Sequence, residues 1–269
     1  MIVYEDKNML VLDKPSGVLT VAGKDKSVPN LAKAVFDSID MNDNLPTEDH
    51  MVVHRLGMDT SGLVILAKNR AAVRTLNGVF RERKVERKYE ALVAGHMERD
   101  HGLISLPVMR DYQCPPYVRI STLDHQIALS DLDPEVVGKK LLEWPKESIT
   151  KYEVMSKEYL EGHPVTRVTL TSISGRYHQL NVHLAAMGHP IVGDSVYGID
   201  GEALPNGGLT KQELNFLVPN KSRASVKLQR DLADIARRKE MSPCIHAKYI
   251  RFTHPYTKKV HEFTNESPF

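Results

Sequence analysis

The chain has 269 residues, of which 41% are hydrophobic and 26% are charged, a composition typical of a globular protein that buries a sizeable core. Its 36 lysines and arginines nearly balance 34 aspartates and glutamates, so the net charge of +2 excludes binding of a polyanion through bulk charge and allows only a local basic patch. Two distant cysteines exclude a disulfide framework, and no apolar run has the length of a membrane span.

Short strands dominate the elements that the sequence predicts. Alternating or continuous apolar residues predict strands at 1–22 (two strands around the turn at 14–17), 63–67, 89–95, 103–130 (short pieces broken by Cys-Pro-Pro), 149–156, 165–172, 248–253 and 258–263. Helical spacing predicts fewer helices, at 28–38, 69–83, 178–187 and in the second half of 199–242. Polar or charged composition predicts irregular structure at 39–50 and 131–148. Many short strands with few helices favour an α+β fold with a mixed, largely antiparallel sheet.

No internal repeat or low-complexity segment divides the chain, and we expect a single domain over residues 1–269. Residues 199–242 depart from the rhythm of short strands with a Gly/Pro-rich stretch and then a basic amphipathic helix, and we expect an insertion there. The N-terminal sequence has neither the apolar core of a signal peptide nor the acid-poor composition of a transit peptide. We therefore expect a cytoplasmic protein, with an organelle as the alternative.

Residues 53–62, Val-His-Arg-Leu-Gly-Met-Asp-Thr-Ser-Gly, gather polar side chains ahead of an apolar run. Asp59 and the two hydroxyls after it are typical of a tight turn, in which such side chains bond to the local backbone. Arg55 lies between apolar residues, where an arginine either pairs with a carboxylate or binds an anionic ligand. The residues alone leave both a structural turn and a functional site open.

A second polar cluster, residues 174–183, begins with a glycine turn and continues as a predicted helix. The first residues of this helix offer Arg176, His178 and Gln179, and a helix N-terminus beside an arginine is a common phosphate site. The alternative is a surface helix in which His183 only fills space. Neither cluster has the ligand spacing of a metal site, and the chain has no Gly-rich phosphate loop.

Taken together, these motifs resemble the signatures of the RluA-type pseudouridine synthases, which convert uridine in structured RNA to its C-glycosidic isomer. The matching motifs run nearly end to end, at 13–17, 54–56 with 59–63, 88–91 with 95–96, 175–176 with 178–180 and 182–183, 188–194 and 246–247. The chain is similar to the small members that have no S4-type domain. The resemblance implies the pseudouridine synthase fold, a mixed, largely antiparallel sheet in two halves with a central cleft, and it implies no cofactor and no metal.

The resemblance also implies roles for particular side chains. In the family, the residue after His-Arg-Leu is the catalytic aspartate, but here it is Gly57, which has no side chain to act on the ribose. Asp59 is the candidate substitute acid, although its default role is to close the turn. Tyr89 corresponds to the tyrosine that stacks on the base, and Arg176 to the basic partner of the catalytic carboxylate. The side chains implied in RNA binding are His54, Arg55, Lys88, His178 and Gln179.

Further features concern RNA contact. Arg55 is the side chain that the family inserts into the RNA stack when the target nucleotide flips out. Asn181 replaces a usual arginine or lysine and removes one phosphate contact, and Tyr177 replaces a small threonine or serine. The basic side chains of the helix within 199–242 either extend the RNA footprint or form a solvated surface, because acidic residues interrupt them.

The absent aspartate leaves Arg176 without its family partner, which predicts one of three arrangements: Asp59 approaches Arg176, water fills the site, or an RNA phosphate occupies it. The first arrangement favours an active RNA pseudouridine synthase. The others favour an RNA-binding protein without catalysis, for example in ribosome assembly. A third reading is an ordinary synthase in which Gly57 is a strain-specific or sequencing change. In each case we expect a monomer that binds a stem-loop of ribosomal or transfer RNA.

Overall fold

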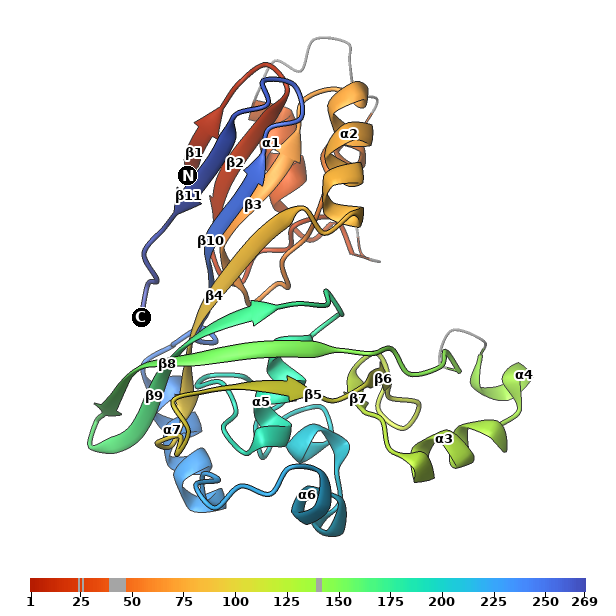
Figure 1. Ribbon diagram of the computed structural model, residues 1–269, viewed down its shortest axis with the longest axis vertical. Coiled ribbons are helices and arrows are strands. Elements are labelled where there is room, and N and C mark those ends of the chain that lie inside the picture. Colours follow the sequence, from red (N-terminus) through yellow and green to blue (C-terminus); the bar gives the residue numbers. More distant parts are fainter. Residues whose placement is uncertain (24, 26, 39–46, 139–141) are drawn as a thin grey trace. The chain divides into compact units, whose positions relative to one another are not determined.

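The computed structural model describes residues 1–23, 25, 27–38, 47–138 and 142–269, so parts of the loops expected at 39–50 and 131–148 lie outside the described residues. The chain divides into two compact units, labelled by element in Figure 1. Unit 1 comprises Met1–Glu90 and Ile245–Phe269, and unit 2 comprises Ala91–Cys244. Strand β4 (Val85–Ala94) carries the chain from the first unit into the second.

The sheet of unit 1 has the strand order β1-β2-β3-β10-β4, with β11 paired to β10. Its other strands are β1 (Ile2–Glu5), β2 (Met9–Lys14), β3 (Ser61–Ala67), β10 (Ile245–Thr253) and β11 (Val260–Thr264). The pairs β1–β2, β2–β3 and β10–β11 are antiparallel, whereas β3 and β10 are parallel, with His246 opposite Ser61. Segments from opposite ends of the chain are thus joined in one sheet.

One face of this sheet is covered by α2 (Arg70–Arg81), which lies along β3 in Figure 1. Ala72 and Leu76 of the helix are fully buried and pack with apolar side chains of β2, β3 and β10. The Asn69 carboxamide caps the helix by accepting a hydrogen bond from the Ala72 N–H at 2.9 Å. The shorter α1 (Leu31–Ser38) and the 3-10 turn η1 (Glu48–Met51) complete the unit, and Asn30 caps α1 in the same way.

In unit 2, the end of β4 begins the strand order β4-β9-β8-β5, and a separate hairpin pairs β6 with β7. These strands are β5 (His101–Ser105), β6 (Val108–Arg110), β7 (Val118–Ile120), β8 (Ile149–Leu160) and β9 (His163–Ser172). β8 and β9 form a long antiparallel hairpin whose two-residue turn, Glu161-Gly162, has φ of 48° and 83°. Positive φ at both positions is the type I′ geometry that suits the twist of a hairpin.

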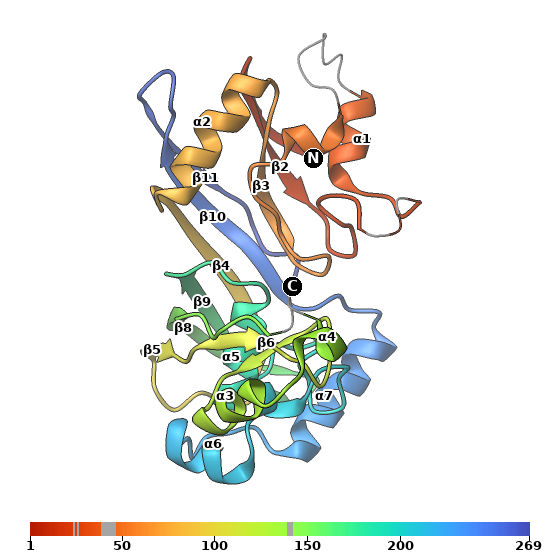
Figure 2. The same ribbon diagram turned by 90° about the vertical axis from the view of Figure 1, so that its right-hand side faces the viewer.

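In unit 2, α5 (Gln179–Met187) is buried on nearly all sides and ends at Gly188 with φ of 83°. The other helices are α3 (Leu123–Ser130), α4 (Pro134–Val137), η2 (Pro205–Gly208), α6 (Lys211–Leu217) and α7 (Val226–Arg238). α7 contacts β9, α5 contacts β7, β8, β9 and η2, and Figure 2 shows these elements from a second side. No helix in the described ranges is long and apolar enough to cross a membrane.

The fold class predicted from the sequence is confirmed: helices pack on a mixed, largely antiparallel sheet, divided between two units. Two of the predicted strand positions are wrong. β1 and β2 meet across Asp6, not across the Pro-Gly turn, because the Asp6 carboxylate accepts hydrogen bonds from the N–H groups of Asn8 and Met9. Residues 123–130 form α3 and not a strand, because Thr122 caps a helix there. The single domain and the insertion at 199–242 stay predictions.

Candidate active site

The segment 54–60 is a loop of unit 1 that leads into β3 and carries the candidate acid. A β-turn closes it, in which the Thr60 N–H donates to the Gly57 carbonyl at 3.1 Å. Met58 and Asp59 are therefore the two central residues of the turn. Arg55 is exposed to solvent, as the proposed insertion into RNA requires, and Asp59 is half-buried.

The buried side chain of Lys14 is hydrogen-bonded to this turn. Lys14 is fully buried, and its ammonium group donates to the carbonyl oxygens of Pro15, Val18 and Met58 at 2.8, 2.7 and 3.0 Å. Burial lowers the Lys14 pKa to about 8, and the negative charge of Asp59 opposes that shift. The Asp59 carboxylate thus supplies a counter-charge to a cation that joins the turn at Met58 to the loop at Pro15 and Val18.

The loop after Lys14 adds further bonds to the same turn. The Ser16 hydroxyl donates to the Asp59 carbonyl at 2.7 Å, and the Gly17 N–H donates to the Met58 carbonyl at 3.0 Å. The Thr20 hydroxyl donates to the Leu56 carbonyl at 2.9 Å and accepts from the Leu56 N–H at 3.1 Å. The motifs at 13–17 and 54–63, which are separate in the sequence, therefore form one hydrogen-bonded structure.

Gly57 does not occupy a position that requires glycine. A Cβ atom built there meets only the Thr60 Oγ1, at 3.5 Å, which is an ordinary van der Waals contact. Gly62 is different: its φ is +109°, and an added Cβ would lie 2.5 Å from the Ala247 carbonyl oxygen on β10. The Thr-Ser-Gly motif therefore serves the close approach of two strands, whereas the position of the missing aspartate accepts a Cβ atom without a clash.

His54 points into unit 1. Its Nε2 accepts a hydrogen bond from the Ile65 N–H at 2.9 Å, and its ring stacks on Phe80 with centroids 4.6 Å apart. Burial, together with the positive charge of Arg87, lowers the His54 pKa to about 3, so the imidazole is neutral at physiological pH. These contacts orient the loop that carries Arg55, and direct RNA binding by His54 stays a prediction.

Tyr89 lies on β4 with its side chain 8% exposed, next to the more accessible Lys88. The Lys88 ammonium lies 5.0 Å from the centre of the Tyr249 ring and pairs with Glu86 at 3.3 Å. The following residue, Glu90, is buried and pairs with Lys248 at 2.7 Å. A buried ion pair and a cation–π contact therefore fix the strand on both sides of the tyrosine.

In unit 2, the buried Gln179 folds the segment that carries Arg176. Its carbonyl oxygen accepts from the Arg176 N–H at 3.1 Å and from the Ser174 hydroxyl at 3.0 Å. Its amide nitrogen donates to the Ile149 carbonyl and to the Thr150 hydroxyl, both at 3.0 Å. Direct RNA contact by Gln179 stays a prediction, and its observed contacts position the backbone of Arg176.

Arg176 is half-buried, and its Nε donates to the Glu147 carbonyl at 3.3 Å. It lines a pocket of unit 2 of about 220 Å³. His183 lies in the core, between the Thr150 hydroxyl at 2.9 Å and the Leu106 carbonyl at 3.0 Å, and burial lowers its pKa to about 4. His183 is therefore a packed core residue, but the expectation of a surface helix around it is wrong, because α5 is buried on nearly all sides. The pairing of Asp59 with Arg176 stays a prediction.

Asn181 and the basic helix have partners within unit 2. The Asn181 amide donates to the Asp194 carboxylate at 2.9 Å. The five basic side chains of α7 and its C-cap each form an ion pair with an acidic residue, namely Lys227, Arg230, Arg237, Arg238 and Lys239. Exposed pairs of this kind contribute little to stability. They favour the solvated surface over the extended RNA footprint.

Sequence reasoning missed the residues that support the candidate loop. Lys14 and Ser16 were recognised only as part of a matching motif, and Thr20 only as part of a strand. Lys14 follows Asp13 and precedes Pro15, so no local apolar pattern marks it as buried. The acceptors that a buried ammonium group needs come from positions 15, 18 and 58, and they become visible only in the structure.

Comparisons with known proteins agree with the fold and with these motifs. A family model described as RNA pseudouridylate synthase matches residues 8–186. The dual-specificity RNA pseudouridine synthase RluA of Yersinia pestis is 36% identical over 197 residues, which cover 73% of this chain and 81% of that protein. The protein of the same name from Haemophilus influenzae is 31% identical over 274 residues, covering 100% of this chain and 93% of that protein.

Among solved structures, human RNA pseudouridylate synthase domain containing 1 superposes with a TM-score of 0.64 at 24% identity, covering 100% of this chain and 83% of that one. Human RNA pseudouridylate synthase domain containing 4 gives a TM-score of 0.65 at 21% identity, with 99% and 88% covered. At these identities the two structures show a shared fold. The family match and the sequence relatives establish more: this chain belongs to the RNA pseudouridylate synthase family and is of the RluA type.

Proposed function

We propose that this protein is an RNA pseudouridine synthase that isomerises uridine in a stem-loop of ribosomal or transfer RNA, with Asp59 as the catalytic carboxylate. Its membership of the family supports the reaction class. The two unpaired cysteines, Cys114 and Cys244, suit a reducing compartment and support action in the cytoplasm. We further propose that it acts as a monomer and needs neither a metal nor a cofactor.

The reaction breaks the bond between uracil N1 and ribose C1′ and forms a bond between C5 and C1′. N1 gains a proton from solvent, and the hydrogen on C5 is released as a proton when the new bond forms, so the isomerisation is redox-neutral and the composition of the nucleotide is unchanged. A carboxylate assists either by attacking C1′ or by removing a proton from C2′. In our proposal Asp59 does this, Tyr89 stacks on the uracil, and Arg176 pairs with the acid.

The observation that carries the proposal is the rigid turn at 57–60. It presents Asp59 two residues after the position that bears the family's aspartate, and it is held by Lys14, Ser16 and Thr20. A fixed loop of this kind lowers the cost of placing a catalytic group. Arg55 is exposed on the same loop, where it supports the flipping of the target nucleotide.

Tritium release from RNA that contains 5-tritiated uridine tests the reaction, because each isomerisation frees one C5 hydrogen. We expect release by the protein as it stands. The Gly57→Asp variant provides the matched comparison, because a Cβ fits at residue 57 without displacing its neighbours. Release by both proteins supports Asp59 as a working acid. Release by neither, in RNA that each protein binds, would contradict the proposal.

A second candidate is an RNA-binding protein that does not isomerise uridine, for example one acting in ribosome assembly. The observation in its favour is electrostatic: the charge of Asp59 already acts on the buried Lys14, which suits a structural role for this carboxylate. Release only from Gly57→Asp would support this candidate, since that change restores the family's acid at the one position where it is absent.

A further inference from the structure

We propose that the pocket beside Arg176 binds an unpaired nucleotide of the RNA, with its base against Trp144 and its phosphate against Arg110 and Lys146. The pocket has a volume of about 220 Å³ and lies wholly in unit 2. The inference rests on the proposed function, because it names a second contact to the same RNA. It concerns a nucleotide other than the one that is isomerised.

The pocket combines an apolar floor with a basic and aromatic rim. The apolar floor of the pocket consists of buried side chains of the β6–β7 hairpin, namely Val108, Met109 and Val118. On the rim, Trp144 and Tyr177 are 67% and 57% exposed, although large aromatic side chains are normally covered. Exposed rings beside a cavity are the surfaces on which nucleic-acid bases stack.

The charges around the pocket are predominantly positive. Arg110, Lys146 and Arg176 contribute three cations, and Glu143 is the acidic side chain among the lining residues and pairs with Lys146 at 2.7 Å. Arg110 is half-buried, and within the described part of the chain its guanidinium has no recorded hydrogen bond or ion pair. A half-buried guanidinium that faces a cavity without a counter-ion is suited to a phosphate group.

Tyr177 is held in place by two further rings. Its ring stacks on that of His178, with centroids 3.8 Å apart and an interplanar angle of 18°. His178 Nδ1 lies 3.2 Å from the hydroxyl of the buried Tyr197, which in turn accepts from the Val118 N–H at 3.2 Å. Burial lowers the His178 pKa, so the neutral imidazole can accept the Tyr197 proton. The residue that departs from the family's usual small side chain is therefore fixed at the rim.

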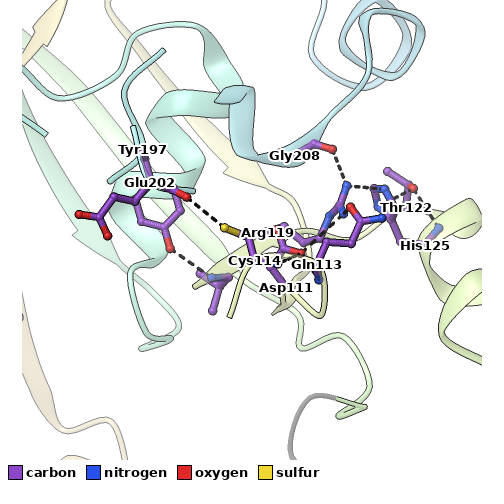
Figure 3. A network of polar contacts seen from close by, with 10 residues as sticks. Asp111, Gln113, Cys114, Arg119, Thr122, His125, Tyr197, Glu202 and Gly208 are labelled. Carbon is purple, nitrogen blue, oxygen red and sulfur yellow. Dashed lines mark hydrogen bonds and ion pairs between the residues drawn. The ribbon is translucent and has the colours of Figure 1, made fainter. Parts of the chain in front are cut away.

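The β6–β7 hairpin, which contributes Arg110 to the pocket, is fixed by a buried arginine. Figure 3 shows Arg119, on the strand paired with that of Arg110, bonded to the Gln113 side chain at 3.1 Å, to His125 and to the Gly208 carbonyl. Asp111 lies 3.9 Å from the same guanidinium. These contacts join the hairpin to α3 and η2, so the Arg110 backbone has a rigid support.

The segment that carries Trp144 is joined to the same hairpin. Lys146 and Val108 exchange two backbone hydrogen bonds, at 2.9 and 3.0 Å. The pocket is therefore formed before any ligand arrives. An acidic peptide would satisfy the cations but would leave both rings exposed to water, whereas a nucleotide offers a phosphate and a flat base together. A nucleotide is for this reason the favoured ligand.

The test uses the single tryptophan of the chain as its reporter. A fluorescein-labelled RNA stem-loop with unpaired uridines is titrated into the full-length protein, and binding is followed by anisotropy. A second titration with unlabelled RNA follows the tryptophan emission. We expect the emission to be quenched with the same dissociation constant as the anisotropy change, because a base on Trp144 quenches it directly. An unlabelled oligoglutamate should leave the emission unchanged.

Variants then separate stacking from charge. We expect Trp144→Ala to weaken binding about tenfold and Trp144→Phe to retain most of it, since every aromatic ring offers a stacking face. Phe216→Ala, which removes an aromatic side chain that is 85% exposed on α6, is the matched control and should bind as the parent does. Arg110→Ala should weaken binding and lower its salt dependence by about one phosphate contact, whereas the exposed Arg74→Ala should not.

Each outcome decides the inference independently of catalysis. RNA binding without quenching, with Trp144→Ala as tight as the parent, would overturn it even if tritium is released. Quenching by oligoglutamate would overturn the choice of a nucleotide, and failure to bind RNA would overturn both proposals. Quenching with the expected loss in Trp144→Ala supports the inference even where no tritium is released, in which case only the proposed activity fails.

Discussion

Lys14 is the side chain on which the candidate loop depends most. Its ammonium group makes three hydrogen bonds to backbone carbonyls and lies in an interior position where burial lowers its pKa to about 8. We expect Lys14→Met to reduce the free energy of unfolding by about 2 kcal/mol, because the carbonyls lose a charged donor. Urea denaturation measures this loss. The control is Lys33→Met, at an exposed ion pair, which should change the stability little.

His183 is one of the buried histidines, with His54, that make the stability of the protein depend on pH. Burial lowers its pKa in the folded state to about 4, below the ordinary value of 6.5. The unfolded chain therefore binds a proton at this residue before the folded chain does as the pH falls below 6.5. Stability is lost in that window, by up to about 1.4 kcal/mol per pH unit. We expect denaturant midpoints to decrease between pH 7 and pH 5.

The same titration in two variants isolates the effect. His183→Gln removes the titrating group and should make the loss of stability between pH 7 and pH 5 smaller than in the parent. His101→Gln changes an exposed histidine on β5 and should leave the pH dependence as it is. An unchanged pH dependence in His183→Gln would show that protonation of the core imidazole does not control acid stability.

At the scale of elements, the sequence predicts best where the signal is local. α1 and α2 follow from apolar spacing, and in the structure Asn30 and Asn69 cap them. The first hairpin is misplaced because a Pro-Gly turn and an aspartate turn compete within 14 residues, and the aspartate bonds that decide between them are not visible in the composition. α3 is missed because its cap, Thr122, lies in a stretch that also suits a strand.

Substitution of Arg119 tests how strongly the β6–β7 hairpin, which forms one wall of the pocket, depends on this side chain for its stability. It and Asp111 are both buried, so Arg119→Met leaves a carboxylate without its nearest cation. We expect a loss of about 3 kcal/mol in the free energy of unfolding. The double variant Arg119→Met with Asp111→Asn should lose less than the sum of the single variants, as interacting residues do. Additive losses would show that the two residues act independently.

At the scale of the whole molecule, the motifs predict which residues belong to the site but not what each one does. Gln179 and His54 belong to matching motifs, yet their contacts lie within the protein and shape loops. A motif can contain both residues that shape a loop and residues that touch RNA. The spacing of the motif alone does not distinguish these two kinds of residue. The β3–β10 pairing, which joins Ser61 to His246, was equally beyond local reasoning because it connects positions 185 residues apart.

The central claim is that the Asp59 carboxylate replaces the acid missing at Gly57, and the most direct measurement compares the parent protein with Asp59→Asn at equal RNA occupancy. Single-turnover release of the C5 hydrogen gives the rate of isomerisation. The claim predicts a rate about 100-fold lower or more in Asp59→Asn, with RNA affinity retained. Equal rates in the two proteins would contradict it and would leave Asp59 as the counter-charge of Lys14.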